Sequence, residues 1–218
     1  MALAIFDLDN TLIGGDSDHL WGVFLVRHGH VDADLYSREN NRFYTEYQQG
    51  TLDINEWLSF QFQPLVAQTT ETLNQWHQQF MVEEIEPILL PKATALIQSH
   101  RDRGDTLLII TATNRFITAP IASLLNIPHL IATNPQMVDG QYSGKVDGLP
   151  SYQGGKITRL EQWREQNPIS MSGSYFYSDS HNDLPLLEHV DHPVAVDPDE
   201  PLRATAAERG WPILSLRN

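Results

Sequence analysis

The chain has 218 residues and a mass of 24.7 kDa, and its 14 basic and 28 acidic residues give a net charge of −14. The absence of cysteine excludes disulfides, thiolate metal sites and a cysteine nucleophile. The acidic balance argues against a nucleic-acid partner, which needs clustered basic side chains. No apolar run is long enough for a membrane span, and no basic leader precedes Asp7. We therefore expect a soluble, cytoplasmic protein without a membrane or nucleic-acid partner.

Four short apolar or aromatic runs predict buried strands, and each ends in small polar or acidic residues. They cover residues 2–6, 106–110, 175–177 and 193–196. Helical patterns separate or follow them, at residues 93–103, 116–125, 156–165 and 184–189. This alternation predicts an α/β fold, in which a doubly wound, Rossmann-like parallel sheet binds ligands beyond the carboxyl ends of its strands.

A long insertion separates the first strand from the others. Its aromatic residues recur at helical spacing, which predicts a helical domain of residues 14–90 inserted into a core of residues 1–13 and 91–218. The insertion holds three basic and twelve acidic residues. We expect most of these acids to form a solvated surface, although a few could line a pocket for a cationic ligand. Farther along, Asp139-Gly140 predicts a β-hairpin over residues 134–146.

Chemically active side chains follow the predicted strands. Asp7 and Asp9 are two apart and can share a face at the end of the first strand, although such a pair is also typical of turns. Thr111 and Ala112 follow the second strand and are expected to begin a helix, whose free N–H groups bind anions. Lys156 follows two glycines at another expected helix start, where it is either a functional cation or an ordinary surface residue.

The third strand is followed by two further acids, Asp179 and Asp183, with Asn182 between them. Four acids beside one lysine suit a hard divalent cation next to a phosphate, and Mg²⁺ needs only one or two carboxylates when a phosphate is present. We therefore expect Mg²⁺ as the cofactor. A zinc site is not expected, because no histidine pair at ligand spacing lies near these strand ends.

Taken in order, these segments resemble the haloacid dehalogenase (HAD) superfamily of phosphotransferases. The matching positions are Asp7-Leu8-Asp9-Asn10-Thr11-Leu12, Thr111, Lys156 and Asp179-Ser180-His181-Asn182-Asp183. The insertion after the first segment looks like the C1-type helical cap of the phosphoserine-phosphatase-like branch (subfamily IB), and the expected hairpin would be a small flap on the HAD core. A receiver-type module also accepts a phosphoryl group on clustered acids, but it is usually half this length and has no cap.

The resemblance implies a role for each matching residue. Asp7 would be the nucleophile that forms an aspartyl phosphate, and Asp9 would be the general acid and base. Phosphate would be bound by Thr111, the Ala112 amide and Lys156, and Asn182 would contact either the phosphate or Lys156. The metal would be held by Asp7, the backbone carbonyl of Asp9 and Asp179, and through a water by Asp183.

The substrate is expected from two positions in the insertion. The phosphoserine-phosphatase pattern has a Glu nine residues after the nucleophile that binds the substrate amine, and Asp16 occupies that position here. The arginine that pairs with the substrate carboxylate aligns with Gln61, which cannot form a charged bidentate contact. We therefore expect a small phosphorylated metabolite with an amine but no carboxylate, with histidinol phosphate favoured. A phosphoserine phosphatase and a phosphotransferase remain alternatives, and the oligomeric state stays open.

Overall fold

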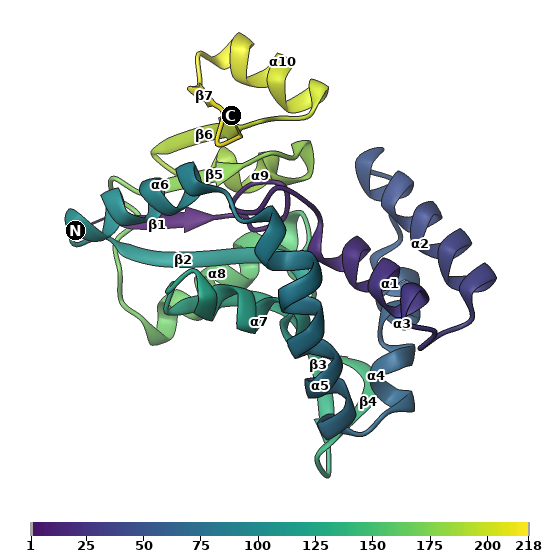
Figure 1. The fold of residues 1–218 in the computed structure, drawn as a ribbon. Coiled ribbons are helices and arrows are strands. Elements are labelled where there is room, and N and C mark those ends of the chain that lie inside the picture. Colours follow the sequence, from purple (N-terminus) through teal and green to yellow (C-terminus); the bar gives the residue numbers. More distant parts are fainter. Residues whose placement is uncertain (1, 218) are drawn as a thin grey trace.

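The computed structural model describes residues 2–217 and contains a seven-stranded sheet of order β4-β3-β2-β1-β5-β6-β7 (Figure 1). Neighbouring strands are parallel except for the antiparallel pair of β3 and β4. The strands are β1 (Leu3–Phe6), β2 (Thr106–Asn114), β3 (His129–Val138), β4 (Gln141–Asp147), β5 (Tyr175–Ser178), β6 (His192–Val196) and β7 (Ile213–Leu214). The predicted α/β, mostly parallel sheet is therefore confirmed.

Both faces of the central strands are buried, which explains why their sequences are continuously apolar. Phe6 and Ile109 belong to one hydrophobic cluster, whereas the alternate residues Ile5 and Leu108 belong to a second. Helices cover the sheet, and they are α6 (Pro91–Asp102), α7 (Arg115–Leu124), α8 (Gly154–Gln166), α9 (Leu184–Leu187), α10 (Glu200–Arg209) and the 3₁₀ turn η3 (His181–Asp183). The doubly wound arrangement is thus the one that the sequence predicted.

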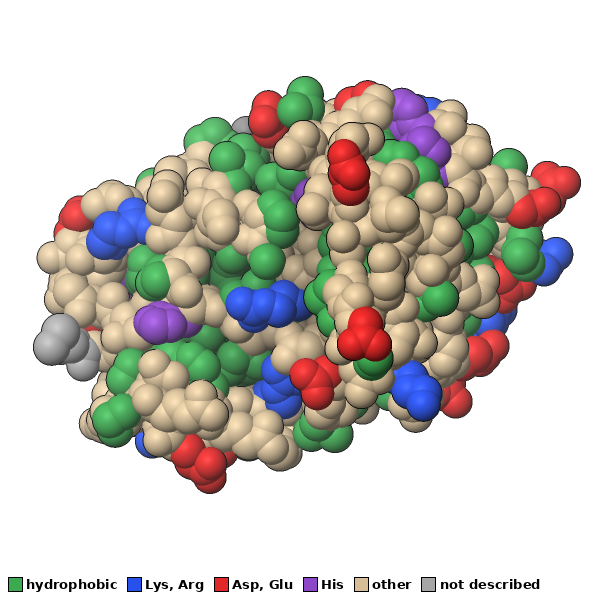
Figure 2. Space-filling view, turned by 90° about the horizontal axis from the view of Figure 1, so that it is seen from below, with side chains coloured by type: hydrophobic (Ala, Val, Ile, Leu, Met, Phe, Trp, Pro, Cys, Tyr) green, Lys and Arg blue, Asp and Glu red, His purple; other side chains and the backbone are tan. Residues whose placement is uncertain are grey.

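The insertion is helical and lies at the carboxyl end of β1 (Figure 1). It consists of α1 (Ser17–Arg27), α2 (Ala33–Gln48), α3 (Ile54–Gln61), α4 (Gln63–Ala67), α5 (Thr70–Phe80), the π-helical η1 (Met81–Ile85) and the 3₁₀ turn η2 (Glu86–Ile88). We call these helices the cap; its exact boundaries at residues 14 and 90 remain a prediction. The chain enters the cap after Ile13 and returns to the core at Leu89. These two residues form an antiparallel bridge, so the entering and returning segments lie side by side. Figure 2 shows acidic side chains gathered toward the cap end of the molecule.

Most of the cap helices have a side-chain N-cap, for which Asp and Thr are favoured residues. Asp16, Asp32, Asp53 and Thr69 each accept a hydrogen bond from a backbone N–H in the first turn of the helix that follows. Several acids of the cap are therefore local capping groups rather than a free charged surface. Within the described part of the chain, no helix is long and apolar enough to cross a bilayer.

Two local expectations need correction. β2 continues to Asn114 and α7 begins at Arg115, so Thr111 and Ala112 lie within the strand instead of opening the helix. The β-prone threonines extend the strand, and Asn114 caps the helix. The hairpin is confirmed, but its first strand also extends backwards into the parallel sheet through residues 129–133.

Candidate active site

The turn after β1 places Asp7 and Asp9 at the end of the central strand. Asn10 adopts a left-handed conformation with φ of 56°, which asparagine tolerates better than most residues. Its N–H donates to the Gly15 carbonyl at 2.9 Å, while the carbonyl of Leu8 accepts from the three residues that follow Asn10. The chain consequently folds back at once, and both carboxylates stay at the strand end.

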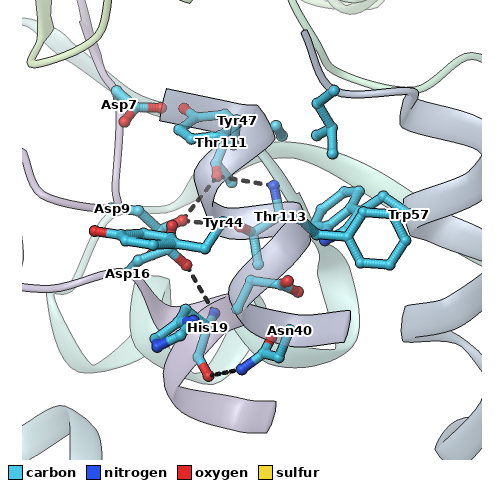
Figure 3. A pocket seen from close by; sticks show the side chains of 14 residues that line it. Asp7, Asp9, Asp16, His19, Asn40, Tyr44, Tyr47, Trp57, Thr111 and Thr113 are labelled. Carbon is cyan, nitrogen blue, oxygen red and sulfur yellow. Dashed lines mark hydrogen bonds between the residues drawn. The ribbon is translucent and has the colours of Figure 1, made fainter. Parts of the chain in front are cut away.

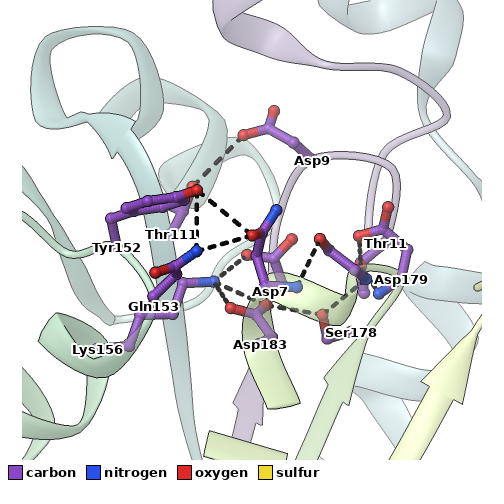
Figure 4. A network of polar contacts seen from close by, with 12 residues as sticks. Asp7, Asp9, Thr11, Thr111, Tyr152, Gln153, Lys156, Ser178, Asp179 and Asp183 are labelled. Carbon is purple, nitrogen blue, oxygen red and sulfur yellow. Dashed lines mark hydrogen bonds and ion pairs between the residues drawn. The ribbon is translucent and has the colours of Figure 1, made fainter. Parts of the chain in front are cut away.

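Lys156 lies at the centre of the acidic residues and is 2% exposed. Its Nζ donates to Asp7 Oδ1 and to Asp183 Oδ2, both at 2.8 Å (Figure 4). The preceding Gly155 is required, because a Cβ at that position would overlap the carbonyl oxygen of Pro150. The alternative of an ordinary surface lysine is therefore wrong.

Two hydroxyl groups fix the acids after β5. Ser178 Oγ donates to Asp183 Oδ2 at 2.7 Å, and Thr11 Oγ1 donates to Asp179 Oδ1 at 3.0 Å. Thr11 also accepts from the Asp179 N–H at 3.1 Å, so the β1 turn and the β5 loop are joined directly (Figure 4). The sequence reasoning assigned no role to Thr11 or Ser178, although both stand inside or next to the acidic segments.

Asp9 connects the sheet to the cap. Its Oδ1 accepts from the Ser17 N–H of α1 at 2.7 Å. Its Oδ2 accepts from Thr113 Oγ1 at 2.9 Å (Figure 3). The Thr111 hydroxyl also points at Oδ2, at the longer distance of 3.4 Å. Thr111 and Ala112 line the same pocket as Asp7, and their role in phosphate binding stays a prediction.

Asn182 lies near these residues but contacts a different set of groups. Its Nδ2 donates to the Tyr47 carbonyl of the cap at 3.0 Å, and its Oδ1 accepts from Gln153 Nε2 at 3.1 Å. Among the hydrogen bonds of the described residues, none joins Asn182 to Lys156, so the phosphate contact is the alternative that stays a prediction. Asn182 instead ties the cap to the core.

Burial and mutual repulsion disturb the ionisation of the acidic side chains. The pKa of Asp7 is raised to about 7, chiefly by burial and also by the charges of Asp183 and Asp9, while Lys156 acts to lower it. Burial also raises the pKa of Asp9 and, together with the charge of Asp7, raises that of Asp179 well above its ordinary value. For Lys156, burial acts in the opposite direction, but the two neighbouring acids raise its pKa overall.

The acidic side chains thus outnumber the one buried lysine among them. The atoms that these side chains offer to a metal ion are all carboxylate oxygens. This composition fits a divalent cation such as Mg²⁺, which prefers oxygen ligands and relieves carboxylate repulsion. Within residues 2–217, no three acidic or histidine side chains converge as a closed metal cage. Mg²⁺ does not require one, because it also takes backbone carbonyls, waters and substrate phosphate.

A pocket of about 510 Å³, counting its open mouth, lies between the acidic residues and the cap (Figure 3). Its lining comprises Asp7, Asp9, Asp16, Asp18, His19, Asn40, Phe43, Tyr44, Tyr47, Leu52, Trp57, Thr111, Ala112 and Thr113. Among these described lining residues there is no lysine or arginine. The pocket is therefore acidic and aromatic on its cap side. Tyr44 and Trp57 are among these lining residues, whereas Trp21 is buried in the core.

Two positions in the cap bear on the ligand. Asp16 caps α1 by accepting from the His19 N–H at 2.8 Å, and burial with the nearby charge of Asp9 raises its pKa to about 7. Gln61 is buried behind the pocket lining and donates through Nε2 to Asp18 Oδ2 at 2.6 Å. The sequence did not single out Asp18. In the structure, this pocket residue accepts the hydrogen bond that the Gln61 amide donates.

Comparison with known proteins identifies the class. The model of the haloacid dehalogenase-like hydrolase family matches residues 4–188, so the chain belongs to this family and is a phosphatase within it, as predicted. A histidinol-phosphatase from Neisseria meningitidis is 47% identical over 219 residues, which cover 99% of each chain. A Bordetella pertussis protein of unknown function has a structure with a TM-score of 0.93, 40% identity and 99% coverage of both chains.

A substrate-bound phosphoserine phosphatase shares the fold more distantly. Its TM-score is 0.72 at 16% identity, and the match covers 99% of this chain and 93% of that one. This likeness supports the core with its inserted cap, and at this identity it carries no information about the substrate.

Proposed function

We propose that the protein is a Mg²⁺-dependent phosphomonoester hydrolase that acts through an aspartyl phosphate, with histidinol phosphate as its substrate. The observation that carries this proposal is a pocket leading from Asp7 whose cap side offers two carboxyl groups, Asp16 and Asp18, with no lysine or arginine among its described lining residues. Histidinol phosphate presents an amine and an imidazole there, and it lacks a carboxylate. The 47% identical histidinol-phosphatase supports this choice, which implies a cytoplasmic enzyme of amino-acid biosynthesis.

Asp7 and Asp9 would divide the reaction into two displacements at phosphorus. In the first, Asp7 attacks the phosphorus, the ester P–O bond breaks, and Asp9 gives its proton to the leaving alcohol oxygen. In the second, water attacks the phosphorus of the aspartyl phosphate while Asp9 takes a proton from it, which releases phosphate and restores the Asp7 carboxylate. The first step requires a protonated Asp9, and burial of this side chain raises its pKa.

The surrounding residues would bind and neutralise the phosphate. Lys156 offsets the repulsion between Asp7 and an anionic substrate, since its Nζ already lies 2.8 Å from that carboxylate. Thr111 and the Ala112 amide line the pocket where phosphate oxygens would bind. Asn182 would support this side of the site through its contact with the cap.

A metal ion would be held by Asp7, the backbone carbonyl of Asp9 and Asp179, with Asp183 acting through a water. Bound there, Mg²⁺ would offset the combined charge of the phosphate and the carboxylates. Thr11 and Ser178 would keep Asp179 and Asp183 in place, because each donates a hydrogen bond to one of them.

Phosphate release from histidinol phosphate, phosphoserine and an aryl phosphate, each with Mg²⁺ and with a chelator, tests the proposal. We expect histidinol phosphate to have the highest kcat/KM, the chelator to abolish turnover, and Asp7→Asn to be inactive. Asp16→Ala should lower kcat/KM for histidinol phosphate more than for the aryl ester. A preference for phosphoserine would contradict the substrate assignment, and turnover that is unaffected by chelation would contradict the metal.

A further inference from the structure

One oxygen of the Asp18 carboxyl lacks a hydrogen bond of normal geometry within residues 2–217. The side chain is 5% exposed, lies in the first turn of α1 and lines the pocket. Its Oδ2 accepts from Gln61, whereas its Oδ1 is buried and makes no hydrogen bond of normal geometry among the described residues. The Trp57 indole N–H is the neighbouring donor, and it lowers the pKa of this carboxyl. Buried polar atoms are nearly always paired, because desolvation without a partner is unfavourable. The unpaired Oδ1 therefore indicates a group that arrives with the ligand.

The position of Gln61 shows from which side a ligand group would reach Asp18. Gln61 does not line the pocket, so it holds Asp18 from behind, while the carboxylate itself forms part of the lining. Burial and the charges of Asp16 and Asp9 raise the pKa of the Asp18 carboxyl well above its ordinary value, and a hydrogen-bond donor from the ligand would stabilise its ionised form. An ionised carboxylate only accepts hydrogen bonds, so the complementary ligand group is an N–H or O–H donor.

Asp16 and Asp18 are not equivalent in the pocket. One oxygen of Asp16 already accepts from the His19 N–H as a helix cap, and the α-amine of the substrate is assigned to this residue by the proposed function. Asp18 makes no such capping bond and is left for a second donor. The aromatic rings of Tyr44 and Trp57 line the same pocket and suit a planar ligand group (Figure 3).

We propose that Asp18 is a specificity residue that accepts a hydrogen bond from a ring N–H of the substrate. The preferred substrates are then phosphate esters of amino alcohols that carry a nitrogen heterocycle. This inference rests on the proposed function, since it assumes that the phosphate sits at Asp7 and the amine at Asp16. It adds a second recognition point, and this point separates heterocycles from carbocycles of similar size.

Two esters with the same phosphate and amine isolate the ring contact. Histidinol phosphate has a ring N–H, and phenylalaninol phosphate has a ring of similar shape without one. We expect the wild-type enzyme to prefer histidinol phosphate by about tenfold or more in kcat/KM, because a hydrogen bond to a charged group discriminates by at least this factor. Asp18→Asn should reduce that preference to within about threefold by slowing histidinol phosphate alone.

A second variant separates recognition from folding. Replacing both partners, Asp18→Leu with Gln61→Leu, removes the ring contact without leaving the Gln61 amide buried and unpaired. It should lose the same preference while its urea midpoint stays close to that of the wild-type enzyme, because replacing both hydrogen-bonding partners by apolar groups is nearly neutral for stability. Asp34→Asn removes an equal charge from an exposed position of α2 and should leave the preference unchanged.

The outcomes distinguish the two proposals. Equal turnover of the two esters by the wild-type enzyme would overturn the role of Asp18 without any variant. Equal slowing of both esters in the Asp18 variants would also overturn it, because that result marks a purely structural residue. A wild-type preference for phosphoserine over histidinol phosphate would overturn the substrate assignment itself, and with it this inference.

Discussion

Lys156 Nζ lies 2.8 Å from Asp7 Oδ1, although 149 residues separate the two positions in the chain. Both side chains are nearly inaccessible to solvent, at 2% and 5% exposure. The same ammonium group contacts Asp183, so one positive charge serves two carboxylates. A buried charge that loses its partner is strongly unfavourable, and this makes the lysine important for the fold as well as for phosphate binding.

Lys156→Met tests this relationship. We expect kcat for an aryl phosphate to fall by about 100-fold or more, because a preorganised cation next to the reacting phosphate is removed. The urea midpoint should also fall, since two carboxylates then repel each other without compensation. Lys92→Met is the control, because Lys92 is exposed on α6 and its one side-chain hydrogen bond within residues 2–217 is to the Arg217 carbonyl. Activity of Lys156→Met within threefold of wild type would contradict the assigned role.

The two glycines before Lys156 allow a matched comparison. A Cβ at Gly155 would overlap the Pro150 carbonyl, whereas a Cβ at Gly154 meets nothing within 4 Å. We expect Gly155→Ala to displace the start of α8 and to lower kcat about tenfold or more, since small displacements of catalytic groups have large effects. Gly154→Ala should retain wild-type activity. Steady-state kinetics of both variants decide the matter, and equal kcat values would show that Gly155 does not position Lys156.

Much of the core follows from local sequence signals. The apolar run before Asp7 and the run ending at Ile110 predicted two central strands, because a strand buried on both faces needs apolar residues throughout. The acids that follow were expected to meet at one edge of the sheet, and Lys156 contacts Asp7 and Asp183 there. Thr111 was expected at the start of a helix but lies within β2. Its β-prone neighbours allow the strand to continue, and no local signal marks the residue at which the strand ends.

The cap side of the pocket was much harder to predict. Asp16 and Gln61 were selected through a resemblance, but the bond from Gln61 to Asp18 joins residues 43 apart in different helices. No periodicity reveals such a pairing, because it depends on how the helices pack. Asp18 consequently looked like one of many surface acids until its burial was known.

Gly50 lies where the cap meets the loop after β5, and it has a positive φ of 69°. A Cβ at this position would lie 2.7 Å from His181 Nε2, next to the Asn182 that binds the Tyr47 carbonyl. We expect Gly50→Ala to lower kcat/KM at least about fivefold by disturbing this contact between cap and core.

Gly29→Ala provides the matched control for that substitution. Its φ is 68°, so the backbone strain of an alanine is the same, but nothing lies within 4 Å of the added Cβ. Both variants should lose a similar amount of stability from strain, and only Gly50→Ala should lose activity. Equal kinetic effects in the two variants would show that the His181 contact has no role in turnover.

Asp105 predicts a pH dependence of stability away from the active site. Burial tends to raise the pKa of this carboxyl, but hydrogen bonds from the Ala2 N–H, His100 and Arg103 outweigh it and hold the pKa at about 2. A folded-state pKa below the unfolded value of 3.8 stabilises the protein above that value, and the benefit disappears as the pH falls toward 2. Asp105→Asn should therefore lower the free energy of unfolding clearly at about pH 5 and less at about pH 3.

Urea unfolding of wild type and Asp105→Asn at both pH values measures this difference directly. The comparison between the two proteins cancels the contributions of the active-site acids, which are the same in both. The exposed substitution Asp34→Asn should stay within about 0.5 kcal/mol of wild type at about pH 5. A gap between wild type and Asp105→Asn that stays constant, or widens on acidification, would show that hydrogen bonding to the Asp105 anion does not stabilise the fold.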